Sequence, residues 1–296
     1  MNRPSATTHP GRLLVAAALA FALAFAGLVA SSGNASATTK ATTSVTIKSI
    51  THPADDTYFI AGTTAVIKGT ASKNIKGKYV YLQVKSGSTW KTANRYRARV
   101  SSTGKFTLKF KTTGVGLKNY RVIYKGSTKL QKSVSAKKRV RVWKWFNLID
   151  EWGGTSETFG TYANTTVDGT EYGFGSRSAW AGYLAGTAHY SGEVTHKVAY
   201  KCVAVKAKVG ISDETPSNVT GSVTVAADGE TIYDSGYMKV ANRMKSFRVS
   251  IKNAYDVTFT YDGPDADTVT YGKAFVVMTS PMALCKSDPV PPGSGN

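Results

Sequence analysis

The sequence contains few of the residues on which most catalytic and metal sites depend. Among its 296 residues are only two cysteines and four histidines. The histidines beyond residue 37 are His52, His189 and His196, and none of them belongs to an H-E-x-x-H motif or a Cys–His signature. A G-x-S-x-G nucleophile turn is also missing. We therefore expect a protein that is not an enzyme and that uses no metal and no cofactor.

Two acidic groups keep a minor alternative open. Asp213 and Glu214 form one group, and Asp262, Asp265 and Asp267 form the other. A glycosidase needs two carboxyl groups that converge in a cleft, whereas both groups fall in turn-like stretches where we expect solvent exposure. The second group offers oxygen ligands for Ca²⁺, but it lacks the full spaced loop of a calcium-binding hand.

Long hydrophobic runs are scarce, and the only one spans residues 13–29. Arg3 and Arg12 precede it, and the small residues Ala-Ser-Ala follow at 35–37. This order is typical of a signal peptide, so we expect residues 1–37 to be removed and the protein to be secreted. A membrane-spanning anchor is the alternative, because the run is almost long enough to cross a bilayer. The stretch has no cysteine for a lipid anchor, so we expect non-covalent retention at the cell envelope.

The two cysteines are Cys202 and Cys285. In an exported chain a single pair of cysteines favours a disulfide. Closing a loop of this length is worth about 4 to 5 kcal/mol, less any strain in the folded state. Metal binding by two cysteines alone is not expected.

Residues 38–145 show short apolar–polar alternations separated by Gly- and Ser-rich turns. The alternations lie at 45–47, 65–67, 80–84, 96–100, 106–110, 120–124 and 134–136. About seven strands in about 100 residues is the rhythm of an immunoglobulin-like sandwich. Four short stretches resemble bacterial surface Ig-like repeats, namely YLQ at 81–83, STW at 88–90, GKFTL at 104–108 and YRV at 120–122.

Acidic residues are almost missing from this first half. Residues 38–145 hold 24 lysines and arginines but only Asp55 and Asp56, a net charge of +22, whereas residues 146–296 carry −4. Many of the cations alternate with apolar residues, which places them on the solvent side of the strands. These are Arg95, Arg97, Arg99, Lys105, Lys109, Lys111, Lys137, Arg139 and Arg141.

Such a charge bias predicts binding to polyanions. Wall teichoic acids, anionic lipids and extracellular DNA are the polyanions available to an exported bacterial protein, and we expect a salt-sensitive contact with their phosphates. Specific nucleic-acid binding is not expected, because no helix-turn-helix or zinc-finger spacing is present. The alternative is that the lysines serve solubility and protect edge strands.

The second half is organised around the stretch GSVTVAADGETIYDSG at 221–236, which predicts a β-hairpin with a tight Asp-Gly turn. Period-two alternation also occurs at 203–209, 247–251 and 257–261. Successive alternating runs indicate antiparallel strands that pack one face into a sandwich core. Between the halves, residues 136–147 contain no Gly or Pro, so we expect one strand to run directly from the first half into the second.

Several motifs of this half resemble the NPCBM family of carbohydrate-binding modules, which occur beside glycosidases in secreted bacterial proteins. The motifs are HYSGEV at 189–194, VGISDE at 209–214, the hairpin at 221–236 and SIKNAYDVTFTYDG at 250–263. The resemblance covers about residues 146–281 and implies a galactose-binding-domain-like jelly roll. It implies a structural role for His189. Lys273 stands where the family usually has an Asp, so a site built on that carboxylate is not expected.

Aromatic residues among Gly and Ser are the glycan-binding candidates, because aromatic faces pack against the C–H face of a sugar ring. The candidates are Trp152, Trp180, Tyr183 and Tyr190. The alternative is that these rings fill the sandwich core.

Together these features predict an all-β chain of two β-sandwich domains. An Ig-like domain at 38–145 is followed by a galactose-binding-like jelly roll at 146–286 and a flexible tail at 287–296. The expected function is that of an exported, non-catalytic protein that binds carbohydrate and the cell wall. The alternative is a structural or protein-interaction surface protein that binds no sugar.

Overall fold

The computed structural model describes residues 39–52, 57–148, 159–160, 165–172, 179–183, 191–251, 254–263 and 275–289. The predicted signal peptide, 1–37, lies outside them. The described part is all-β, as predicted: it contains strands β1 to β20 and a single 3-10 turn, Lys73–Ile75. None of its helical segments has the length and hydrophobicity to span a membrane.

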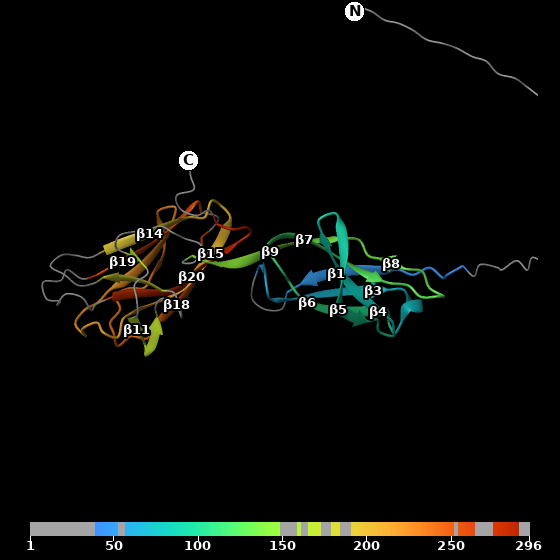
Figure 1. The fold of residues 1–296 in the computed structure, drawn as a ribbon, viewed down its shortest axis with the longest axis horizontal. Coiled ribbons are helices and arrows are strands. Elements are labelled where there is room, and N and C mark those ends of the chain that lie inside the picture. Colours follow the sequence, from blue (N-terminus) through green and yellow to red (C-terminus); the bar gives the residue numbers. More distant parts are fainter. Residues whose placement is uncertain are drawn as a thin grey trace, which may run out of the picture. The chain divides into compact units, whose positions relative to one another are not determined.

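The first half forms a sandwich of two sheets (Figure 1). The smaller sheet has the order β1-β3-β6, and the larger has the order β9-β7-β4-β5, with β8 paired to β7 and β2 paired in parallel to β9. Immunoglobulin-like sandwiches connect their strands in this Greek-key manner, although the family of this half stays a prediction. The strands are β1 Val45–Thr51, β2 Phe59–Ile60, β3 Thr64–Ala71, β4 Tyr79–Ser86, β5 Thr89–Arg99, β6 Lys105–Lys111, β7 Gly116–Tyr124, β8 Ser133–Val134 and β9 Lys138–Asn147.

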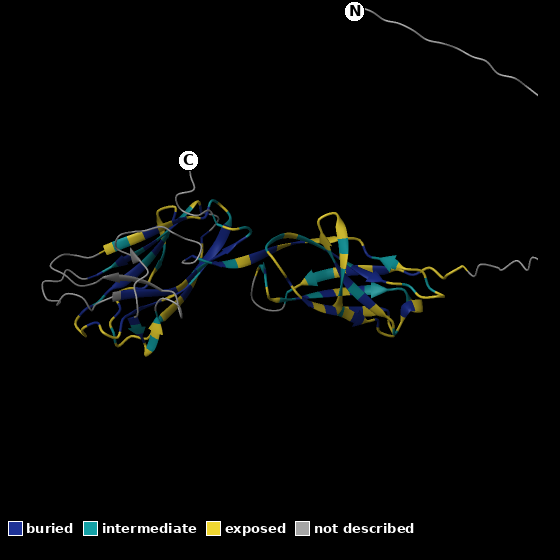
Figure 2. Cartoon of the chain, in the orientation of Figure 1, coloured by how far each residue is buried: buried dark blue, intermediate teal, exposed yellow. Residues whose placement is uncertain are grey.

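Period-two alternation builds the core of this sandwich (Figure 2). In β6 each of the apolar residues Phe106, Leu108 and Phe110 is buried, and each residue between them is exposed. The same cluster includes Ile67 from β3 and Leu82 from β4. Because the two sheets face each other through these side chains, the polar half of each strand must face solvent.

The second half is a sandwich of the same kind with a different strand order. One layer is the sheet β14-β19-β16-β17. In the other layer β20 pairs with both β13 and β15. β13 also pairs with β10, and β15 also pairs with β18. A separate hairpin joins β11 and β12. The strands are β10 Phe159–Gly160, β11 Thr165–Val167, β12 Thr170–Tyr172, β13 Ala179–Tyr183, β14 Ser191–Lys197, β15 Cys202–Ile211, β16 Ser222–Ala227, β17 Glu230–Asp234, β18 Lys245–Ser250, β19 Asp256–Asp262 and β20 Phe275–Cys285.

The predicted hairpin is confirmed as β16 and β17. Its turn residues Asp228 and Gly229 have φ angles of 49° and 83°, which is the left-handed pair of a turn that matches the twist of two antiparallel strands. The Asp228 carboxylate accepts hydrogen bonds from the backbone N–H groups of Tyr255 and Asp256 at 2.9 and 2.8 Å. The hairpin is therefore fixed to the start of β19, its neighbour in the sheet.

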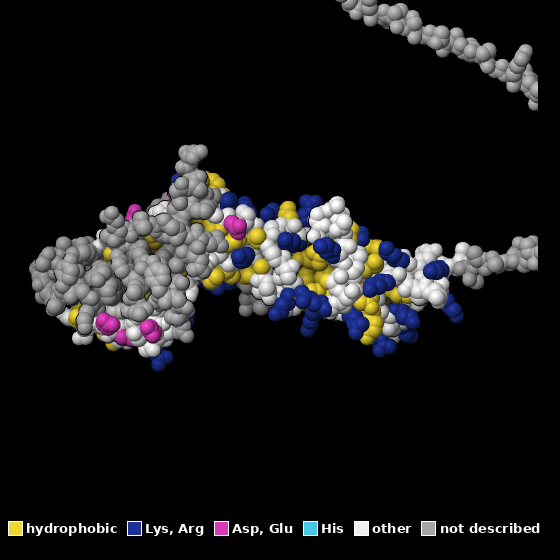
Figure 3. Space-filling view, in the orientation of Figure 1, with side chains coloured by type: hydrophobic (Ala, Val, Ile, Leu, Met, Phe, Trp, Pro, Cys, Tyr) yellow, Lys and Arg dark blue, Asp and Glu magenta, His cyan; other side chains and the backbone are white. Residues whose placement is uncertain are grey.

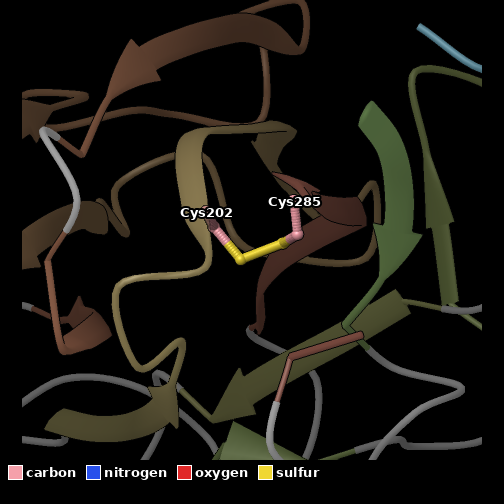
Figure 4. The surroundings of a disulfide bond; sticks show 2 residues. All are labelled: Cys202 and Cys285. Carbon is pink, nitrogen blue, oxygen red and sulfur yellow. A yellow bond between two sulfur atoms is a disulfide. The ribbon is translucent and has the colours of Figure 1, made fainter. Parts of the chain in front are cut away.

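The predicted disulfide is present between Cys202 and Cys285 (Figure 4). The two residues are directly paired at the ends of β15 and β20, and both are fully buried. They belong to the hydrophobic cluster that joins the two layers of the second sandwich, together with Val225, Phe259 and Tyr261.

Strand β9 takes part in both halves of the chain. Its first residues pair with β7 as far as Val142, and its last residues pair with β20 from Lys144 to Asn147. The expectation of one uninterrupted strand is thus confirmed. Trp143 packs in a small cluster with residues that include Ile60 and Leu284, while Phe146 belongs to the core of the second sandwich.

Stability at mildly acidic pH should depend on His196, which is buried in β14 and packs edge-on against Phe259. Burial lowers the pKa of His196 to about 4, from about 6.5 in an unfolded chain. Between these two values the unfolded state binds the proton and the folded state does not. The stability that the protein gains from a neutral His196 is therefore fully present above pH 6.5. As the pH drops to 4, the free energy of unfolding falls by about 3 kcal/mol. Urea denaturation of the protein and of His196→Gln across this range should show a steeper loss for the natural sequence. Equal slopes would contradict the assignment.

Candidate functional site

The larger sheet of the first sandwich displays a group of basic side chains on its outer surface, which we call the cationic face. Residues directly opposite each other in antiparallel strands point to the same side of a sheet. The outward residues Tyr79 and Tyr81 of β4 lie opposite Arg99 and Arg97 of β5. The cationic face comprises Arg97, Arg99, Arg121, Lys125, Arg139 and Arg141.

Aromatic rings on this face hold three of the cations in place. The pairs, measured from the Arg Cζ or Lys Nζ atom to the ring centroid, are Arg97 over Tyr79 at 4.6 Å, Lys125 over Tyr81 at 4.5 Å and Arg121 over Trp90 at 4.1 Å. Each exposed cation–π contact is worth about 0.5 to 1 kcal/mol. The contacts restrict the long side chains while leaving the charges at the surface.

Arg121 is fixed by a hydrogen bond to a buried side chain as well as by its ring contact. Its Nε donates a hydrogen bond of 2.7 Å to Oε1 of Gln83, and Nε2 of Gln83 donates one of 2.9 Å to the Thr92 hydroxyl. Gln83 is buried, so its amide depends on these partners. Partial burial lowers the pKa of Arg121, but a guanidinium stays charged at neutral pH because its ordinary pKa is above 12.

Two other cations are tied to the ends of the sheet. Nζ of Lys125 donates a hydrogen bond of 3.0 Å to the side-chain oxygen of Asn94, and Nε of Arg99 donates one of 3.0 Å to the carbonyl of Gly77. The cationic face is therefore a partly ordered array of charges, in which fewer side-chain rotamers are left to be fixed by a ligand.

The structure divides the nine predicted polyanion-binding residues among several places. All nine are exposed, but only Arg97, Arg99, Arg139 and Arg141 share the cationic face. Lys105, Lys109 and Lys111 project from the outer side of β6 in the other sheet. Lys137 precedes β9. The basic residues thus lie on both outer surfaces of the sandwich, and the nine predicted residues do not form one patch.

Arg95 is separated from Arg97 by an irregularity in β5. Tyr81 pairs with Arg97, whereas the next residue of β4, Leu82, pairs with Ala93. Residues 94–96 of β5, which include Arg95, therefore have no paired residue in β4. The Cζ atom of Arg95 lies 4.7 Å from the ring centroid of Tyr96. Arg121 and Lys125 were not predicted, although YRV at 120–122 carries the same alternation as the predicted rows.

In the view of Figure 3, Lys and Arg side chains are spread over the half that carries β1 to β8, and the Asp and Glu side chains lie over the other half. Among the residues that the structure describes, the first half contains no acidic side chain, because Asp55 and Asp56 lie outside them. The charge difference predicted from the sequence is therefore displayed at the surface.

Two glycan candidates lie on one strand. The backbones of Trp180 and Tyr183 belong to β13, where they pair with Met278 and Phe275 of β20. Residues 179–183 show no apolar–polar alternation, and alternation alone does not predict this strand. Other residues singled out in this half lie outside the described part, namely Trp152, His189, Tyr190, Asp265, Asp267 and Lys273. A role for the four aromatic candidates stays a prediction.

Two described carboxylates of the second half accept hydrogen bonds at turns. Asp213 accepts hydrogen bonds of 2.9 and 3.0 Å from the backbone N–H groups of Asp168 and Gly169, at the turn of the β11–β12 hairpin. Asp234 accepts one of 2.7 Å from the N–H of Gly236. Within the described ranges, no three His, Cys, Asp or Glu side chains are grouped as metal ligands would be.

Two facing antiparallel layers, one of them cross-linked by the buried disulfide between β15 and β20, define the second half as a β-sandwich module. The family model for the NPCBM/NEW2 domain matches residues 165–276. The match confirms the resemblance of this half to the NPCBM family that its motifs indicated.

Solved structures from Clostridium perfringens are similar to this chain. The CBM51-2 and INT domains of ZmpB are 13% identical, with a TM-score of 0.35, over 60% of this chain and 39% of that one. CBM51-2 of ZmpB in complex with GlcNAc, with the INT domains, is 14% identical, with a TM-score of 0.34, over 74% and 43%. CBM51 of GH95 in complex with methyl-galactose is 15% identical, with a TM-score of 0.32, over 47% and 99%. This chain thus spans less than half of the two ZmpB structures. No curated protein sequence matches it.

Replacement of Arg121 by Ala should destabilise the first sandwich. The buried Oε1 of Gln83 loses its hydrogen-bond donor, and Trp90 loses the guanidinium above it. We expect a loss of about 1 to 2 kcal/mol in the free energy of unfolding, measured by urea denaturation. Lys109→Ala removes the same charge from the exposed side of β6 and should change stability by less than about 0.5 kcal/mol. Equal effects of the two substitutions would contradict a specific role of the Gln83 contact.

Proposed function

We propose that this is an exported, non-catalytic protein that binds glycan through its NPCBM/NEW2 domain and adheres to anionic polymers of the cell envelope through its basic sandwich. The observation that carries the proposal is the segregation of charge. Residues 38–145 have a net charge of +22, whereas the half that contains the carbohydrate-binding module is close to neutral.

Electrostatics favour a polyanion as the partner of the basic sandwich. The cations repel one another, and the described part of this half offers no carboxylate to relieve that repulsion. A polymer of phosphates relieves it and releases its own counterions, which makes the affinity strongly dependent on salt. Because the basic residues cover both outer surfaces, adhesion of this kind needs no single orientation on the wall.

Glycan is the proposed partner of the second half because carbohydrate-binding modules of this kind bind sugars. The similar CBM51 structures were solved with GlcNAc and with methyl-galactose, so hexoses and their N-acetylated forms are the first ligands to test. Trp152, Trp180, Tyr183 and Tyr190 are the proposed contacts.

Two features support the proposed export. The segment 1–37 resembles a signal peptide, and the disulfide suits an oxidising compartment outside the cytosol. Electrostatic adhesion would then keep the secreted protein at the envelope without a covalent anchor.

Adhesion to walls should weaken steeply with salt. In a pull-down of the full chain on purified Gram-positive cell walls, retention at 50 mM salt should fall at least tenfold at 500 mM, because each phosphate contact contributes a counterion-release term. Walls stripped of teichoic acid serve as the control and should retain little protein at any salt concentration. Retention that is equal at low and high salt would overturn the electrostatic part of the proposal.

Binding to glycan should depend on Trp180. On an array of immobilised polysaccharides, Trp180→Ala should lose at least tenfold in signal if the ring packs against a sugar. Tyr237→Ala is a suitable control, since Tyr237 is an exposed aromatic residue in the link between β17 and β18. Unchanged binding by Trp180→Ala would remove this residue from the site. If the natural protein binds none of the wall and plant glycans, the structural alternative is favoured.

A further inference from the structure

A groove of about 450 Å³ runs between the edges of the two sheets in the first sandwich. One wall is formed by β1 at residues 48–50, the other by β9 at residues 138–141, and residues 57–59 lie between them with Trp143. β1 is an edge strand of its sheet, and β2 pairs only with Val142 and Trp143. In the described part of the chain, therefore, no strand covers this side of residues 138–141, and the space stays open.

A β-bulge supplies the basic residue on the β1 side. Ile47 pairs with Gly69 and Ser49 pairs with Lys68, so that Lys48 is the extra residue between two consecutive pairs. Bulges turn a side chain away from the direction that strict alternation would give it. Lys48 is exposed and lines the groove.

Four cations line the groove, and no acidic side chain appears among its described lining residues. They are Lys48 on one side and Lys138, Arg139 and Arg141 on the other, and all four are exposed. Arg139 and Arg141 belong to the cationic face as well, because they lie at the sheet edge where that face meets the groove. A concave site lined by charges of one sign concentrates the field and attracts counter-ions. Two of the four are arginines, whose planar guanidinium groups match phosphate oxygens with two parallel hydrogen bonds.

Aromatic rings give the same groove an apolar wall. Tyr58 and Trp143 pack edge-on with their centroids 5.0 Å apart, and Phe59 packs edge-on against His52 at 4.9 Å. Tyr58, Phe59 and Trp143 line the groove together with the four cations. An aromatic wall suits the carbon-containing links between the phosphates of a polymer, because C–H groups pack on aromatic faces.

We infer that the groove between β1 and β9 is a binding site for a linear phosphate-bearing polymer. Its phosphates contact Lys48, Lys138, Arg139 and Arg141, and its carbon-containing links lie against Tyr58 and Trp143. This inference rests on the proposed adhesion to anionic polymers. It goes further by naming one site on a sandwich whose two outer surfaces both carry basic residues, and by naming phosphate as the group that is recognised.

The test compares two variants of the full chain that lose the same charge. Lys48→Gln, Arg139→Gln and Arg141→Gln together remove three groove cations, whereas Lys105→Gln, Lys109→Gln and Lys111→Gln remove three exposed cations of β6. Binding of long-chain inorganic polyphosphate is measured at several salt concentrations. The groove variant should bind at least tenfold more weakly, and its log–log salt dependence should be shallower by about 2, since three phosphate contacts are lost. The β6 variant should stay within about threefold of the natural protein.

The other outcomes are equally decisive. Equal losses by the two variants would overturn the groove and leave general electrostatic adhesion intact. An unchanged groove variant would also overturn it. If polyglutamate shows the same difference between variants as polyphosphate, recognition of phosphate is wrong. Failure of the natural protein to bind polyphosphate at low salt, combined with salt-sensitive retention on walls, would overturn the groove alone. Failure of both assays would overturn the proposed function as well.

Discussion

Side chains along each strand point alternately to the two faces of its sheet, and this two-residue period decides where the charge of the chain lies. In the first sandwich every strand must give one side to the core, so that Phe106, Leu108 and Phe110 face inward and the lysines between them face outward. A chain with 24 cations and two acids in this stretch then has to place its charge on the two outer surfaces. The charges are spread over a large area, which weakens the repulsion between them. Cation–π contacts on β4, β5 and β7 also stabilise three of the cations where they lie.

Irregularities in this period create the local differences that a uniform sandwich would lack. The misalignment in β5 removes Arg95 from the row of Arg97 and Arg99. The bulge in β1 does the reverse, because it brings Lys48 to the groove beside β9. Both features add residues to one strand without adding them to its neighbour, and both change which cations lie together.

Much of the fold could be predicted from the sequence, because alternation and turn chemistry are local. The hairpin of β16 and β17 followed from Asp228-Gly229, and the Cys202–Cys285 bond followed from there being one pair of cysteines. The grouping of cations could not be predicted, since it depends on strand register and on which strands lie at sheet edges. Alternation shows that Lys105 and Arg97 both face solvent, but only the pairing of strands shows that they belong to different sheets. Trp180 was missed as a strand residue because β13 is rich in Gly and Ala and shows no alternation.

The sharing of β9 has a mechanical consequence. A pulling force on the first sandwich enters the second through this strand, and the first backbone pair that it loads is Lys144 with Cys285. Cys285 is bonded covalently to β15, the neighbour on the other flank of β20. Tension that β9 passes to β20 at this point is shared with β15 through the covalent cross-link, so β20 cannot separate from β15 at this end by the loss of hydrogen bonds alone.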